Sequence, residues 1–196
     1  HCSVIPLDPT LANRLEVLLH DVENFVRDQL VPAFVAARMD SETAAIVVPG
    51  WDGDPQAAEY QAAVVRSGAA LEQYGLAAED ARRLSTRAMD FIVRNLWDED
   101  HGGWIELARE VGEEKQTITQ ARVLTALAEF LMVSGDFEVA ERVVETFKVV
   151  QVFCADNLSG GYRSRFARDW TIMDSDSNSG ALPMLAEGFA TTYLAT

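Results

Sequence analysis

The sequence is poor in the side chains that most metal and redox functions need. Among 196 residues there are two cysteines, Cys2 and Cys154, and three histidines, His1, His20 and His101. Neither cysteine has a second thiol or a histidine at metal-ligand spacing, so no disulfide framework, redox centre or metal site is expected. Phosphate-binding loops and other cofactor motifs are also missing, and we expect no cofactor.

Basic residues are scarce too: 16 Lys and Arg stand against 31 Asp and Glu, a formal net charge of −15. Nucleic acids and anionic lipids bind through basic side chains, so neither is an expected partner of this acidic protein. Long apolar runs are absent, which excludes a membrane span. The start, HCSVIPLDP, lacks a basic region followed by an apolar run, so we expect no signal peptide and predict a cytoplasmic location.

What the sequence does have is helical periodicity. Between residues 11 and 37, apolar residues recur at helical spacing and predict an amphipathic helix that Pro32 bends or interrupts. The apolar stripe comprises Leu15, Leu18, Leu19, Val22, Phe25, Val26, Leu30 and Phe34. Further helices are expected at about 56–74, 77–97, 117–134, 137–154 and 180–195. Strand-like segments are few and short, so the expected fold class is all-α, built of paired helices.

An internal repeat organises these helices. A shift of 58 residues places Asp98–Trp104 (DEDHGGW) on Asp156–Tyr162 (DNLSGGY), and LTALAE at 124–129 on LPMLAE at 182–187. The paired glycines allow a tight, hairpin-like turn with positive φ, and the leading Asp can bond the backbone of its own turn. Each helix pair has an apolar face that only its neighbour can bury. We therefore expect one domain over residues 1–196, with clear repeats at 75–135 and 136–196 after N-terminal helices at 9–74.

Helix pairs joined by such Gly-Gly-aromatic hairpins resemble the (α/α)6-barrel superfamily, in which six inner helices surround a cavity. Within it, residues 98–144 are most similar to the N-acylglucosamine 2-epimerase and mannose isomerase group. The likeness rests on GGW, a lysine, Gln120-Ala121-Arg122 opening an inner helix, and Ser-Gly-Asp before the outer helix. Six repeats would need roughly 350 residues, so the resemblance, over residues 75–196, implies a partial or shortened toroid of α/α-hairpin repeats.

The resemblance implies an isomerase or epimerase that acts on a mannose- or N-acylglucosamine-type sugar. It places Arg122 on an inner helix, where the guanidinium fork would hold a sugar oxygen, and Glu187 in the cavity. A salt bridge for Arg122, or helix pairing for Glu187 and its repeat partner Glu129, is the non-functional alternative. Three aromatic residues are candidates for stacking on a sugar ring, or else for plain packing: Trp104, Tyr162 and Trp170.

One departure leaves the activity open. The family segment reads Asn and then His-x-x-Glu; Asn178 and Glu187 fall near those places, but Met184 stands three positions before Glu187. Proton transfer next to a carbonyl needs an acid and a base, usually two imidazoles. No histidine of this chain lies on an inner-helix position of either repeat.

Two other hypotheses therefore stand beside the isomerase. One is a glycan-cleaving barrel with paired carboxylates, such as Asp100 or Asp169. The other is a non-catalytic or truncated barrel that acts as a binding module. In every case a partial barrel would expose its inner helices, so we expect burial in a homo-oligomer or against further barrel segments.

Overall fold

The computed structural model describes residues 9–108, 114–158, 160–174 and 181–196. The chain begins with α1 (Pro9–Phe25), which continues through a π-helical turn, η1 (Val26–Leu30), into α2 (Val31–Val35). Pro32 has no amide hydrogen, and just before it the Val31 N–H bonds to the Val26 carbonyl, one residue wider than an α-helical bond. The predicted interruption at Pro32 is thus a local widening of the helix.

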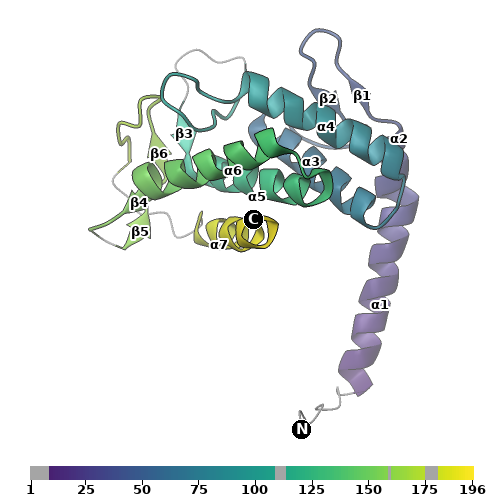
Figure 1. Ribbon diagram of the computed structural model, residues 1–196. Helices are drawn as coiled ribbons and strands as arrows, with labels where there is room; N and C mark the ends of the chain where they lie inside the picture. Colours follow the sequence, from purple (N-terminus) through teal and green to yellow (C-terminus); the bar gives the residue numbers. More distant parts are fainter. Residues whose placement is uncertain (1–8, 109–113, 159, 175–180) are drawn as a thin grey trace.

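Two layers of helices follow (Figure 1). Their bounds are α3 (Ala58–Gln73), α4 (Ala78–Asn95), α5 (Thr117–Ser134), α6 (Phe137–Val149) with a π-helical end η2 (Val150–Cys154), and α7 (Ala181–Ala195). Helix α3 packs against α4 and α5, and α5 packs against α6 and α7. Alternate helices α3, α5 and α7 therefore form one row. Helices α4 and α6 pack against this row, as outer helices do in part of an α/α barrel.

The burial of α5 shows that it lies at the centre of this arrangement. Its fully buried residues occupy most of the helix circumference (Ala121, Val123, Leu124, Ala126, Leu127, Ala128), and the remaining side carries the partly exposed Arg122 and Glu129. A helix that is apolar over most of its surface needs neighbours on most of its sides. Helix α4, by contrast, buries one stripe and exposes its charged side, which suits an outer helix.

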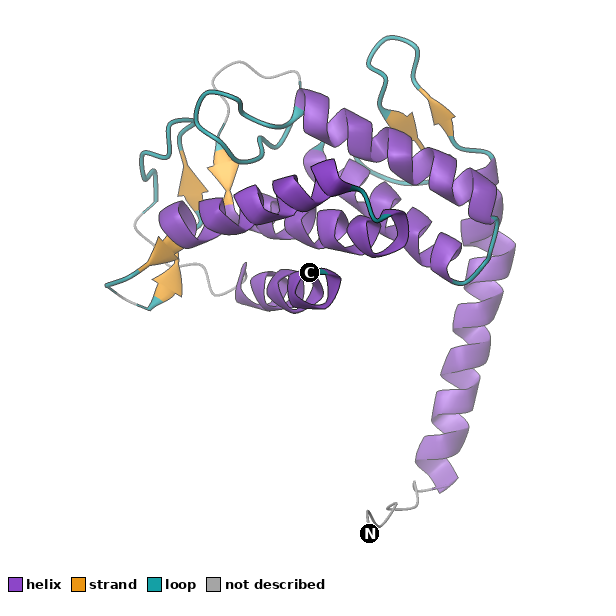
Figure 2. Cartoon of the chain, in the orientation of Figure 1, coloured by secondary structure: helices purple, strands orange, loops and turns teal. Residues whose placement is uncertain are grey.

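Short antiparallel strand pairs connect the helices (Figure 2). They are β1 (Arg38–Met39) with β2 (Ile46–Val47), β3 (Lys115–Gln116) with β6 (Arg165–Phe166), and β4 (Ala155–Asp156) with β5 (Gly161–Tyr162). The pair β4–β5 encloses the second Gly-Gly-aromatic motif, and a single bridge between Trp97 and Trp104 encloses the first. The expected hairpins are confirmed.

Helix α1 has an apolar side that the described chain leaves largely uncovered. It projects away from the helical body (Figure 1), and Leu18 and Leu19 are 58% and 62% exposed. Only Phe34, at the far end of the predicted stripe, is fully buried. None of the described helices is both long and apolar enough to cross a bilayer.

Candidate functional site

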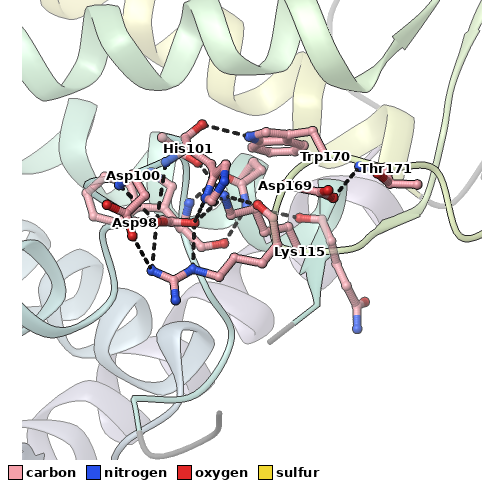
Figure 3. Close-up of polar contacts among 12 residues, drawn as sticks. Asp98, Asp100, His101, Lys115, Asp169, Trp170 and Thr171 are labelled. Carbon is pink, nitrogen blue, oxygen red and sulfur yellow. Dashed lines mark hydrogen bonds and ion pairs between the residues drawn. The ribbon is translucent and has the colours of Figure 1, made fainter. Parts of the chain in front are cut away.

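A buried ion pair lies where the first repeat loop, residues 98–104, meets the loop that contains Arg168 (Figure 3). Asp98 Oδ2 accepts a hydrogen bond from Lys115 Nζ at 2.8 Å, and Arg168 donates to both Asp98 oxygens at 3.0 and 3.1 Å. The Lys115 ammonium also donates to the carbonyls of Gly102 and Arg168, at 2.6 and 2.7 Å, and lies 4.7 Å from the centre of the Trp170 ring. Every Lys115 proton is used, so this lysine joins the loops rather than meeting a ligand.

The charges of this cluster are stabilised by one another. Burial alone raises the pKa of Asp98, but hydrogen bonds from Arg168 and Lys115 outweigh it and hold the pKa far below its usual range. Burial lowers the pKa of Lys115, and the hydrogen bond to Asp98 opposes that shift. Asp100 and His101 have ligand atoms near Asp98, the one candidate metal group among the described residues. Because Asp98 is already paired with two cations, this group is a poor metal site.

Asp98 and Asp156, the aspartates that open the two repeat loops, each accept a hydrogen bond from the backbone of their own loop. Asp98 Oδ1 accepts a bond from the Asp100 amide at 3.1 Å, and Asp156 Oδ1 accepts one from the Leu158 amide at 3.1 Å. Both copies thus bond their own loop backbone. The repeat of this residue therefore needs no catalytic explanation.

The two carboxylates of the glycan-cleaving hypothesis, Asp100 and Asp169, lie at exposed loop positions. Asp100 is an exposed loop residue 3.3 Å from the Arg168 guanidinium. The backbone amide of Thr171 donates to Asp169 and lowers the pKa of Asp169. A glycosidase acid needs the opposite shift, because it must hold a proton near neutral pH. The described contacts of Asp100 and Asp169 therefore lend no support to the glycan-cleaving hypothesis, which stays a prediction.

The three aromatic candidates lie in this same loop region. Trp104 is fully buried, and its indole N–H donates to Thr146 Oγ1 at 2.9 Å. Trp170 is 7% exposed, and its indole N–H donates to the His101 carbonyl at 2.9 Å. Tyr162 is half-buried on β5. In the described structure all three rings lie outside the hollow described next.

A hollow of about 310 Å3 opens on the row of inner helices. It is lined by the loop before α3 and by residues of α3, α5 and α7: Trp51, Asp52, Gly53, Asp54, Glu59, Tyr60, Ala62, Ala63, Arg66, Arg122, Thr125, Met184 and Glu187. The structure thus brings together Arg122 and Glu187, the two residues that the sequence placed in the cavity, from helices α5 and α7.

Charged pairs join these helices at the hollow and beside it. Arg122 of α5 forms an ion pair with Glu59 of α3. Arg66 of α3 binds Glu129 of α5 with two hydrogen bonds of 3.0 Å and Glu187 of α7 with one of 2.6 Å. The hydrogen bond to Glu129 is the main cause of a raised pKa for Arg66, which keeps this guanidinium charged. These partly exposed groups are oriented by one another and remain accessible to a polar ligand.

An aromatic ring that sequence reasoning missed borders the hollow. Trp51 is half-buried and meets Phe34 and Tyr60 edge to face, with ring centres 6.0 and 5.8 Å apart. Tyr60 is in turn fixed, because its hydroxyl accepts a bond from the Val48 amide at 2.9 Å. The one signal in the sequence is the run Trp51–Asp54 (WDGD), which is similar to the repeat loops in composition but has a different spacing to the helix that follows.

The position three residues before Glu187 also faces the hollow, and it is Met184. A thioether cannot transfer a proton at any accessible pH. The titratable groups that line the hollow are carboxylates, guanidiniums and the phenol of Tyr60, whose hydroxyl is bonded to the backbone of Val48; no histidine is among the described lining residues. Asn178, the other expected cavity residue, lies outside the described residues.

The profile of a protein family, N-acylglucosamine 2-epimerase (GlcNAc 2-epimerase), matches residues 52–187 of this chain. The chain belongs to this family. The matched range runs from the loop that borders the hollow to Glu187 on α7.

Solved structures of similar fold support the assignment of a partial α/α barrel. Cellobiose 2-epimerase from Spirochaeta thermophila DSM 6192 superposes with a TM-score of 0.78 at 20% identity, over 96% of this chain and 51% of that one. A sugar epimerase from a ruminal bacterium gives 0.75 at 20% identity, over 91% and 50%. D-mannose isomerase gives 0.71 at 16% identity, over 85% and 45%. This member of the N-acylglucosamine 2-epimerase family thus spans about half the length of these similar chains.

Proposed function

We propose that the hollow binds a mannose- or N-acylglucosamine-type sugar, as part of a barrel that isomerises or epimerises it. The meeting of Arg122, Glu187 and Trp51 at one hollow is the observation that carries this proposal. Trp51 offers an apolar ring face and the charged pairs offer oriented donors and acceptors, the combination that a sugar requires. Carboxylates outnumber guanidiniums on the lining, which favours an uncharged sugar.

The hollow is better suited to binding than to proton transfer. Removal of the proton next to a carbonyl needs a base with a pKa near the working pH, and its return needs an acid. Met184 occupies the place where the family resemblance implies an imidazole. We therefore propose that the proton-transfer groups come from further barrel segments, and that these described helices hold and orient the sugar.

The test is calorimetric titration of the chain with mannose and with N-acetylmannosamine. We expect saturable binding of at least one sugar, weakened about 30-fold by Arg122→Ala, because a charged hydrogen bond contributes about 2 kcal/mol. Arg83→Ala, which removes an exposed arginine on the outer helix α4, is the matched control and should leave binding unchanged. If the wild-type chain binds neither sugar, the proposed function is wrong.

A second measurement separates binding from chemistry. The chain is incubated with either sugar in heavy water, and C2 is examined for deuterium by NMR. We expect none from the chain alone, since no imidazole is among the described residues of the hollow. Deuterium at C2 would place the proton-transfer groups within this chain and contradict their proposed origin in further segments.

We also propose that helices of further barrel segments cover the open side of this structure. An apolar groove of about 1240 Å3 runs between α1, the C-terminal part of α3 and α7. Leu19, Val22 and Leu30 line it from the N-terminal helices, and Leu194 lines it from α7. A groove lined by exposed apolar side chains is suited to contact with a further protein segment.

The expected consequence is self-association of the isolated chain. Sedimentation velocity should show concentration-dependent oligomers, and the double substitution Leu18→Lys/Leu19→Lys on the exposed side of α1 should reduce them several-fold. Arg14→Glu on the same helix changes charge but removes no apolar side chain, and serves as the control. A wild-type chain that stays monomeric at all concentrations would argue against an interface on this side.

A further inference from the structure

Two glutamates at the same place in the internal repeat meet a single arginine. Glu129 closes the LTALAE segment on α5, and Glu187 closes the LPMLAE segment on α7. Arg66, on α3, donates hydrogen bonds to both. Each helix of the inner row thus contributes one member of a charged chain that runs Glu129, Arg66, Glu187.

The two glutamates use their oxygens differently. Glu129 accepts from Arg66 Nε through Oε2 and from Arg66 Nη2 through Oε1, so both oxygens are occupied, and it lines the apolar groove. Glu187 accepts from Arg66 through Oε1 only. Its Oε2 accepts no hydrogen bond from the described parts of the chain, its side chain is 48% exposed, and it lines the hollow. The two copies of the repeat thus carry the same residue with the same partner, Arg66, but differ in how many of their oxygens that partner occupies.

We propose that Arg66 is a positioning residue, anchored by Glu129, that holds Glu187 Oε1 so that Oε2 is presented to a hydroxyl group of the bound sugar. This proposal rests on the proposed function of the hollow. It assigns Glu129 and Arg66 to the support of the site and Glu187 to contact with the ligand.

The physical basis is preorganisation. A free glutamate side chain samples several rotamers, and fixing it when a ligand binds costs free energy of binding. The planar guanidinium fork is itself fixed by its paired bonds to Glu129, so it can hold Glu187 before the sugar arrives. Lysine at position 66 would keep the charge, but its ammonium group lacks the planar geometry with which Arg66 makes paired hydrogen bonds to Glu129 while it also bonds Glu187.

A double-mutant cycle on sugar affinity tests the proposal. We expect Arg66→Met to weaken binding about tenfold, Arg66→Lys to weaken it less, and Glu187→Ala to weaken it at least tenfold. In the Glu187→Ala background, Arg66→Met should have no further effect, because no carboxylate remains to be held. Additive losses would mean that Arg66 contacts the sugar itself, and would overturn the proposal.

A crystal structure of the Arg66→Met protein gives a readout that needs no sugar. We expect the Glu187 carboxylate to leave its wild-type position while α7 stays in place; an unmoved carboxylate overturns the proposal. If Arg66→Met does not fold, the same comparison is made with Arg66→Lys. Failure of the wild-type chain to bind sugar would refute the proposed function, whereas the position of Glu187 in the variant decides the role of Arg66 independently.

Discussion

Asp98→Asn should lower the free energy of unfolding by about 3 kcal/mol, because it leaves the buried Lys115 ammonium without its counter-charge. The side chains of both residues are fully buried, and Lys115 has no route to solvent without separating the two loops that it joins. In a chain of this length we expect a fall of about 10 °C in the melting temperature. Chemical denaturation monitored by circular dichroism measures the loss.

Asp156→Asn is the matched control, since Asp156 occupies the same place in the second repeat. Its side chain is 15% exposed and its Arg163 partner is 3.5 Å away, so this substitution should cost less than about 1 kcal/mol. The double variant Asp98→Asn/Lys115→Met should be less destabilised than the sum of its single substitutions, because it removes both charges. Equal losses of unfolding free energy for Asp98→Asn and Asp156→Asn would contradict this prediction. They would mean that the ion pair with Lys115 adds no stability to that of the loop hydrogen bonds, which both aspartates make.

The same pair predicts a pH dependence. The pKa of Asp98 is depressed in the folded protein, so its contribution to stability is complete above the ordinary aspartate pKa of about 4. That contribution is lost progressively as the pH falls from there towards the depressed value. The difference in stability between wild type and Asp98→Asn should therefore be constant from pH 7 to about pH 5 and should shrink in stronger acid.

The fold could be predicted from the sequence because its signals are local. Apolar spacing located the helices, and Gly75 and Gly135, at predicted helix ends, have φ of +69° and +63°. The Gly-Gly-aromatic motif gave the hairpin loops. The uncovered side of α1 was not evident, because an apolar stripe looks the same in sequence whether or not a partner covers it.

The site could be predicted only in part, because it depends on contacts far apart in the chain. Arg122 and Glu187 were found through the family resemblance. Arg66 had no signal, since its partners lie 63 and 121 residues away and no motif surrounds it. Trp51 lies in a WDGD run whose spacing to the next helix differs from that of the two clear repeats. Sequence marks an aromatic residue as able to stack on a sugar, but only the fold decides which ring reaches the hollow.

Gly103→Ala should be about as damaging as loss of the buried pair, at about 3 kcal/mol. Gly103 has φ of +84°, and an added Cβ would lie 2.5 Å from Trp170 Cζ2 and 3.1 Å from Gln120 Oε1. The left-handed backbone alone costs an alanine about 1 kcal/mol, and the clash adds about 2 kcal/mol of overpacking. Trp170 cannot retreat freely, since its ring stacks on Phe153 at 4.8 Å and its indole N–H bonds to the His101 carbonyl.

Gly102→Ala separates the two costs. Gly102 also has positive φ, at +69°, but the nearest atom to its added Cβ is Val149 Cγ2 at 3.6 Å, an ordinary contact. We expect it to lose only the conformational part, about 1 kcal/mol, in the same denaturation experiment. If the two substitutions destabilise the protein equally, the positive φ of both residues is enough to explain why glycine is needed at positions 102 and 103. A larger loss at Gly103 would show that the second glycine is required because the Trp170 ring packs directly against the backbone of the neighbouring loop.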